Sequence, residues 1–234
     1  MPLRQLSYGF KVLVSIPFHF PFQGPWLTAL AGAGKTFLTS RVIDHVQSRL
    51  KSSPNPEGFA FFYCNRNEEE RRKPLSVLRS YTRQLSTTAG HPGEIRKKLR
   101  ALWRETTLRG SDFGFDACRE QLLESVNLYP RTTLVLDALD ECDPGSRDRL
   151  VEMIELLLSS SKSLLRVFIS SRPDADIRDR FLSRPNIEIQ ATDNQEDIKK
   201  FVNEEIVKHR RWNNISAQLR EDVVKTLLAR SEGM

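Results

Sequence analysis

Continuous apolar runs and segments with helical periodicity alternate along this chain of 234 residues. The apolar runs have the length of strands and lie at 26–30, 59–64, 134–136 and 164–169. Runs of this kind are typical of strands buried on both faces of a parallel sheet. A shorter run, Ile187-Glu188-Ile189, has an acid at its centre, which favours a position at the edge of the sheet.

Between these runs, apolar residues recur three or four positions apart, as they do on one face of a helix. The pattern predicts helices at about 36–50, 74–85, 95–104, 115–128, 195–206 and 217–230. The residues Thr192-Asp193-Asn194-Gln195 resemble a capping box at the start of the fifth of these helices. Strands that alternate with helices predict an α/β fold.

The first 25 residues are expected to form an apolar leader of uncertain structure. No residue from Val12 to Gly34 carries a formal charge, and Pro17, Pro21 and Pro25 interrupt this segment at four-residue intervals. Prolines at this spacing, together with the short apolar stretch before them, argue against a membrane span or a signal peptide. No membrane partner is therefore expected.

A loop of small residues joins the first predicted strand to the first predicted helix. Its candidate phosphate-binding residues are Gly32, Ala33, Gly34, Lys35 and Thr36. The glycines let backbone N–H groups approach phosphate oxygens, Lys35 supplies a cation for the outer phosphates, and Thr36 supplies a hydroxyl for magnesium. The helix N-terminus that follows attracts anions. The full pattern G-x-x-x-x-G-K-[ST] has glycine where this chain has Ala29.

A second chemical element follows the apolar run at 134–136. A strand that ends in an acid delivers a carboxylate to the carboxyl edge of a parallel sheet, where ligands bind. Asp137 is therefore a candidate magnesium ligand together with Thr36. Asp140 and Glu141 are candidate catalytic residues, since a carboxylate on this loop can orient or deprotonate an attacking water. A solvated acidic loop is the alternative, and the phosphate loop upstream argues against it.

The fourth strand is followed by Ser170-Ser171-Arg172-Pro173. The planar guanidinium of Arg172 suits the oxygens of a terminal phosphate, which makes it a third candidate catalytic residue. The alternative is a structural arginine that caps the turn before the proline. Both interpretations stay open at this point.

Charge and cysteine content narrow the class of function. The formal net charge is +6, but basic residues mostly alternate with acids on the helical segments, which is typical of a solvated surface. No specific nucleic-acid partner is therefore expected. The three cysteines, Cys64, Cys118 and Cys142, lie far apart without metal or disulfide spacing. This usage fits a reducing cytosol, so we expect a cytoplasmic location.

Several segments together resemble one family. They are Ala31 to Leu38, Phe61 to Cys64, Pro74 to Ser80, Leu136 to Cys142 and Ser170 to Pro173. The chain resembles a NACHT domain of the STAND class of P-loop NTPases, of the nephrocystin-like N-terminal type common in filamentous fungi. The resemblance runs from about Trp26 to Met234.

The resemblance implies a P-loop NTPase three-layer sandwich with a parallel five-stranded sheet in the order 5-1-4-3-2, followed by the start of a helical subdomain. It divides the chain into the leader 1–25, a NACHT core at 26–192 and the truncated start of a helical lid at 193–234. Such a module binds ATP or GTP with Mg²⁺ and hydrolyses it slowly. A conformational switch then drives self-association or association with other NACHT protomers.

The leading hypothesis is a signal-transduction NTPase module, a fragment of a larger NLR-like receptor of the STAND class. Two alternatives stay open. The first is a non-catalytic interaction scaffold with a decayed nucleotide site, which the alanine at position 29 favours. The second is a P-loop small-molecule kinase, although no phosphoacceptor pocket is evident in the sequence. Whether the module turns over nucleotide is left open.

Overall fold

The computed structural model describes residues 26–29, 34–87, 97, 100–101, 104, 113–181, 186–189, 195–208 and 216–231. Its strands are β1 (Trp26–Ala29), β2 (Gly58–Tyr63), β3 (Arg131–Asp137), β4 (Leu164–Ser171) and β5 (Asn186–Ile189). Its α-helices are α2 (Lys35–Ser52), α3 (Pro74–Thr87), α5 (Phe115–Asn127), α6 (Pro144–Ser160), α7 (Ala175–Phe181), α8 (Gln195–Lys208) and α9 (Ala217–Ser231). Two 3₁₀ turns, η1 (Glu69–Arg72) and η2 (Leu139–Glu141), complete these elements.

The described strands pair in parallel and form one sheet in the order β2-β3-β4-β1-β5. The expected α/β fold with a parallel sheet is confirmed. β3 lies between β2 and β4, and every residue from Thr132 to Asp140 is buried. Burial on both faces explains why this segment lacks the polar alternation of a strand that borders solvent.

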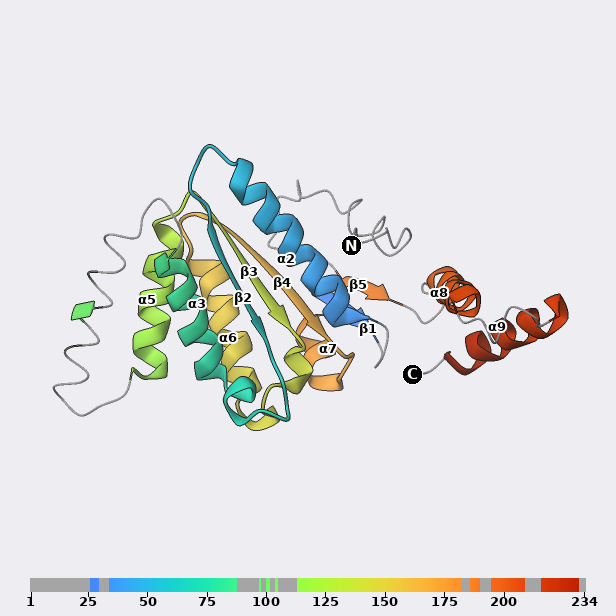
Figure 1. Cartoon of the computed structure of the whole chain (residues 1–234). Helices are drawn as coiled ribbons and strands as arrows, with labels where there is room; N and C mark the ends of the chain where they lie inside the picture. The colour runs from blue at the N-terminus through green and yellow to red at the C-terminus, as the bar shows by residue number, and fades with distance from the viewer. Residues whose placement is uncertain are drawn as a thin grey trace.

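Helices cover both faces of the sheet, with α2 on one face and α3, α5 and α6 on the other (Figure 1). Side chains of β3 alternate between the two faces, because successive residues of a strand point in opposite directions. Val135 packs in the cluster beneath α2, which includes Val46 and Phe168. Leu134 and Leu136 pack in the larger cluster beneath the other three helices. The two clusters clamp the sheet and fix the positions of its strand ends.

Two described helices were not expected from the sequence, α6 and α7. α6 begins with Pro144 at its first position, where the missing N–H of proline costs no intrahelical bond. It buries Leu150, Ile154 and Leu157 at helical spacing. α6 carries the chain from the end of β3 back to the start of β4, so it is the crossover that makes these two strands parallel.

The remaining expectations fall at the two ends and in one long connection. α8 and α9 contact one another beside the edge formed by β5 (Figure 1). The expected leader 1–25 and the capping box at 192–194 lie outside the described residues. The helix expected at 95–104 is described only at four exposed helical positions. Within the described ranges, no helix combines the length and hydrophobicity needed to cross a membrane.

Candidate functional site

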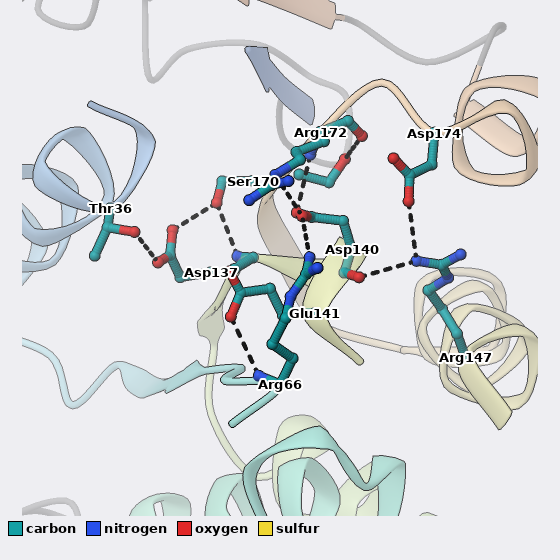
Figure 2. Close-up of polar contacts among 11 residues, drawn as sticks. Thr36, Arg66, Asp137, Asp140, Glu141, Arg147, Ser170, Arg172 and Asp174 are labelled. Atoms are coloured by element: carbon teal, nitrogen blue, oxygen red, sulfur yellow. Dashed lines mark hydrogen bonds and ion pairs between the residues drawn. The ribbon is translucent and has the colours of Figure 1, made fainter. Parts of the chain in front are cut away.

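The candidate site lies where the carboxyl ends of β3 and β4 meet the N-terminus of α2. The register pairs Leu136 of β3 with Ile169 of β4, so Asp137 and Ser170 extend side by side from neighbouring strands. β2 ends at Tyr63, which pairs with Asp137 of β3. Figure 2 shows the polar side chains that converge from these strand ends and from α2. This is the edge of a parallel sheet at which ligands bind.

Gly34 has the backbone conformation that starts α2. Its φ is 83° and its ψ 17°, in the left-handed region that glycine enters without steric cost. A Cβ added at Gly34 would meet nothing within 4 Å, so the torsion angle alone, and not space, favours glycine. The N–H of Leu38 donates to the Gly34 carbonyl at 3.0 Å and closes the first turn of the helix. The expected phosphate-binding residues Gly32 and Ala33 lie outside the described residues.

Asp137 accepts hydrogen bonds from three neighbouring hydroxyl groups. Its Oδ2 accepts a hydrogen bond from the Thr36 hydroxyl, with the two oxygens 2.8 Å apart. Its Oδ1 accepts hydrogen bonds from the hydroxyls of Thr39 at 2.6 Å and Ser170 at 2.5 Å. Figure 2 draws the bonds from Thr36 and Ser170. Three hydroxyl donors therefore satisfy this buried side chain. Ser170 also accepts the Ala138 N–H at 3.0 Å, which ties β4 to the loop after β3.

The carboxylate and hydroxyl oxygens of Asp137 and Thr36 lie together, as a magnesium site requires. Mg²⁺ is usually held by one or two carboxylates and substrate phosphates and keeps several waters. Within the described ranges, no group of three His, Cys, Asp or Glu side chains could hold a metal by itself. The donor set therefore fits a Mg²⁺ ion that shares its ligands with a bound anion.

Sequence reasoning overlooked Thr39 as part of this site. Thr39 follows Thr36 by three positions, so both lie on the same side of α2, and Thr39 is buried. Its hydroxyl hydrogen-bonds both the Lys35 carbonyl at 2.9 Å and Asp137. A threonine one turn into the helix that follows the glycine-containing loop was the signal available in the sequence.

The loop after β3 turns sharply at Ala138. This residue has a φ of 56° and a ψ of 53°, and among the described non-glycine residues it is the one with positive φ. A left-handed alanine stores strain of about 1–3 kcal/mol, which the surrounding contacts must offset. The turn directs Asp140 and Glu141 of η2 to different neighbours.

Asp140 is enclosed by arginines from two other strand ends. The Arg172 N–H donates to Oδ1 at 2.9 Å, and the Arg172 Nε lies 3.2 Å from Oδ2 (Figure 2). The Nη2 of Arg66, from the loop after β2, lies 3.6 Å from the same Oδ2. The Asp140 side chain is only 2% exposed. Its carboxylate is therefore engaged by Arg172, which brings two of the three expected catalytic residues into contact.

Glu141 lies on the outer side of this cluster. Its Oε2 accepts the backbone N–H of Arg66 at 3.2 Å (Figure 2). Glu141 is partly exposed, in contrast to Asp140. Of the two acids on this loop, Glu141 therefore has the carboxylate that water can reach. Arg66 was not expected to belong to the site, because its role depends on the spatial proximity of β2 to β3.

Lys35 begins α2 beside these charges. Burial lowers the pKa of the Lys35 ammonium, and the Asp140 carboxylate is the largest influence that raises it again. Asp137 and Glu141 raise it further, whereas Arg172 lowers it. Lys35 is therefore close enough to feel every charged candidate residue of the site.

Arg147 of α6 fastens this loop to the segment that follows β4. Its Nη1 donates to the Asp140 carbonyl at 3.3 Å and lies 3.5 Å from a carboxylate oxygen of Asp174 (Figure 2). Its Nη2 lies 2.5 Å from a carboxylate oxygen of Asp176 in α7. The Arg147 side chain is 6% exposed, whereas those of Asp174 and Asp176 are 43% and 50% exposed. Asp140 is thus held at its backbone carbonyl by Arg147 and at its carboxylate by Arg172.

The parallel sheet, the glycine-started helix and the acid at the end of β3 define a protein with a P-loop NTPase-like fold. A family model described as the N-terminal region of nephrocystin 3 matches residues 23–172, more than half of the chain. The chain belongs to this family. No curated protein sequence matches it.

Solved structures agree on the fold. The Orc1 protein of Aeropyrum pernix, determined in complex with DNA, has a TM-score of 0.52 at 13% identity, over 78% of this chain and 44% of that one. A Walker-type ATPase of Pyrococcus abyssi has a TM-score of 0.50 at 10% identity, over 86% of this chain and 57% of that one. The chain spans about half the length of either protein. At these identities the likeness establishes the fold alone.

Proposed function

We propose that this chain is a magnesium-dependent nucleotide-binding module that takes ATP or GTP between the N-terminus of α2 and the ends of β3 and β4. The observation that carries the proposal is the convergence of Thr36 on Asp137, with Lys35 beside them. A hydroxyl and a carboxylate for the metal and an ammonium for the phosphates are the groups that a nucleotide polyphosphate requires. Gly34, with its left-handed backbone, starts the helix whose N-terminus attracts the phosphates.

The residues divide the work as follows. Thr36 and Asp137 would hold Mg²⁺, which neutralises phosphate charge when it is bound. Lys35 neutralises the outer phosphates, and its half-buried position strengthens that attraction relative to an exposed lysine. Arg172 supplies a further positive charge at the far side of the site. Glu141, the accessible carboxylate, orients the attacking water if the module hydrolyses nucleotide.

The proposal extends to the wider class. We infer a slow NTPase of the NACHT type in the STAND class, in which 26–192 form the nucleotide-binding core and α8 and α9 belong to the start of a helical lid. In this interpretation nucleotide binding changes the conformation of a cytoplasmic signalling receptor and promotes association between NACHT protomers. The nephrocystin-type family match at residues 23–172 supports the P-loop core, and the NACHT and STAND assignment rests on the sequence resemblance described above.

Isothermal titration calorimetry with ATP and with GTP in the presence of Mg²⁺ tests the proposal. The parent chain is expected to bind at least one nucleotide, and Lys35→Ala is expected to abolish binding, since a phosphate-facing ammonium is lost. Lys162→Ala is the matched control, because Lys162 is exposed and precedes β4, at the end of that strand opposite the candidate site. Unchanged affinity in Lys35→Ala would sink the proposal.

The same titration separates the alternatives. A parent chain that binds neither nucleotide would favour a non-catalytic scaffold, in which Ala29 at the end of β1 prevents the loop from closing. A chain that binds nucleotide and transfers its terminal phosphate rapidly to a small-molecule acceptor would favour a kinase.

A further inference from the structure

Two guanidinium groups approach the same buried carboxylate oxygen, Asp140 Oδ2. Arg172 Nε lies 3.2 Å away and Arg66 Nη2 lies 3.6 Å away. Within the described part of the chain, Oδ2 accepts no hydrogen bond of acceptable geometry from any group. Both contacts are thus ion pairs without the aligned N–H···O geometry that makes an arginine pair strong. The two arginines have donors to spare for another anion.

The three side chains differ in their exposure to solvent. The Asp140 side chain is 2% exposed, whereas those of Arg66 and Arg172 are 52% and 39% exposed. The carboxylate is therefore fixed inside the protein, and the two arginines reach it from the solvent side. Lys35 feels both Asp140 and Arg172. Three cations thus lie near Asp140, with Asp137 and Glu141 as the other acids of the site, and the two exposed guanidinium groups are the ones that an incoming anion can reach.

The loop that carries Arg66 is anchored by its backbone and not by the guanidinium. The Arg66 N–H donates to Glu141 at 3.2 Å, and the Asn65 N–H donates to the Arg71 carbonyl at 3.2 Å. The Asp143 N–H donates to the Arg72 carbonyl at 2.9 Å and joins the loop to the end of η2. The Arg66 side chain can therefore turn from Asp140 to a ligand without loss of the loop's own contacts.

We propose that Arg66 is a second phosphate-contacting arginine, which joins Arg172 on the terminal phosphate of a bound nucleoside triphosphate. Asp140 is the counter-ion that holds both guanidinium groups in place before the phosphate arrives. A nucleoside diphosphate lacks the group that the two arginines would share. Arg66 therefore discriminates triphosphate from diphosphate. This inference rests on the proposed function, because it assigns a specificity-determining residue to the same site.

The test is calorimetric titration of the full chain with Mg²⁺ and either a non-hydrolysable ATP analogue or ADP. Arg66→Ala is expected to weaken binding of the triphosphate analogue about tenfold, the size typical of one lost charge-assisted contact, and to leave ADP affinity within about twofold. Arg66→Lys is expected to recover only part of the loss, since an ammonium lacks the planar fork of arginine. Both substitutions keep the backbone N–H that binds Glu141.

Arg149→Ala is the matched control. Its side chain is 56% exposed, and its described contacts are with Asp116 at 4.0 Å and with the ring of Phe115. Triphosphate affinity that is unchanged in Arg66→Ala, or an equal loss for ATP analogue and ADP, would overturn the role of Arg66 while nucleotide binding itself stands. A parent chain that binds neither ligand would overturn the proposed function and this inference with it.

Discussion

The contrast between Asp140 and Glu141 gives the sharpest test of the site's architecture. Asp140 is buried and accepts a charge-assisted hydrogen bond from the Arg172 N–H, a contact that contributes about 1.5–3 kcal/mol. Its ion pairs with two half-exposed arginines add less than about 1 kcal/mol each. Asp140→Asn removes the charge and turns an amide donor toward guanidinium donors. We therefore expect it to lower the free energy of unfolding by about 2 kcal/mol.

Glu141→Gln serves as the comparison, because Glu141 is partly exposed and its one described hydrogen bond comes from a backbone N–H. We expect this substitution to change the free energy of unfolding by no more than about 0.5 kcal/mol and to slow hydrolysis more than it weakens nucleotide binding.

Urea unfolding without nucleotide, followed by circular dichroism, measures the difference. With a denaturant dependence of about 2 kcal/mol per molar urea, Asp140→Asn should shift the midpoint by about 1 M. Equal midpoints for parent and Asp140→Asn would refute a structural role for this carboxylate. If Asp140→Asn instead kept its stability and lost turnover, Asp140 and not Glu141 would be the acid that acts on water.

Two further predictions concern packing and pH. Gly58→Ala should lower the free energy of unfolding by about 1–3 kcal/mol, because the new Cβ would lie 2.6 Å from Thr132 Oγ1 and 2.8 Å from Tyr129 Cδ2. Gly145→Ala is the control, because its new Cβ would meet nothing within 4 Å. It should leave the urea midpoint unchanged or slightly raised. Burial raises the pKa of the Cys118 thiol from its ordinary 9.0 to about 11, so the unfolded chain loses this proton first as pH rises. The contribution of the protonated thiol to the free energy of unfolding, at most about 3 kcal/mol, should therefore be fully present below pH 9 and lost by about pH 11. The difference in unfolding free energy between the parent and Cys118→Ala should become smaller between these two pH values. A gap that stays constant with pH would contradict this assignment.

The strands were predictable from the sequence because burial on both faces leaves an uninterrupted apolar run. Their limits were less so. β3 begins at Arg131, three residues before the apolar run, because Thr132 and Thr133 are buried in the sheet. Threonine is polar in composition but β-branched in shape, and it suits a pleated surface. Polarity alone therefore placed the start of this strand too late.

α6 was missed for a different physical reason. Its first two turns carry a glycine and the charged residues Arg147, Asp148 and Arg149, which obscure the apolar periodicity that begins at Leu150. Arg147 is buried nonetheless, because carboxylates of the α7 region neutralise it. A charged residue that is paired in the folded chain is indistinguishable in sequence from one in water.

The candidate site was predictable where a side chain follows directly from a strand end or lies at the start of the first helix, as Thr36 does. Asp137 and Arg172 could be assigned to the sheet edge in this way. The contact between Arg172 and Asp140, and the approach of Arg66, depend on which strands are neighbours and on their register. No local pattern encodes a pairing between residues that lie on three separate strand ends.

The buried guanidinium of Arg147 has a mechanical consequence. It donates a hydrogen bond to the carbonyl of Asp140 and forms ion pairs with Asp174 and Asp176. It therefore connects the acidic loop to the start of α7. A displacement of that loop by a ligand would either move α7 with it or break several contacts of Arg147 together. Such an all-or-none choice converts a small local shift into a discrete rearrangement.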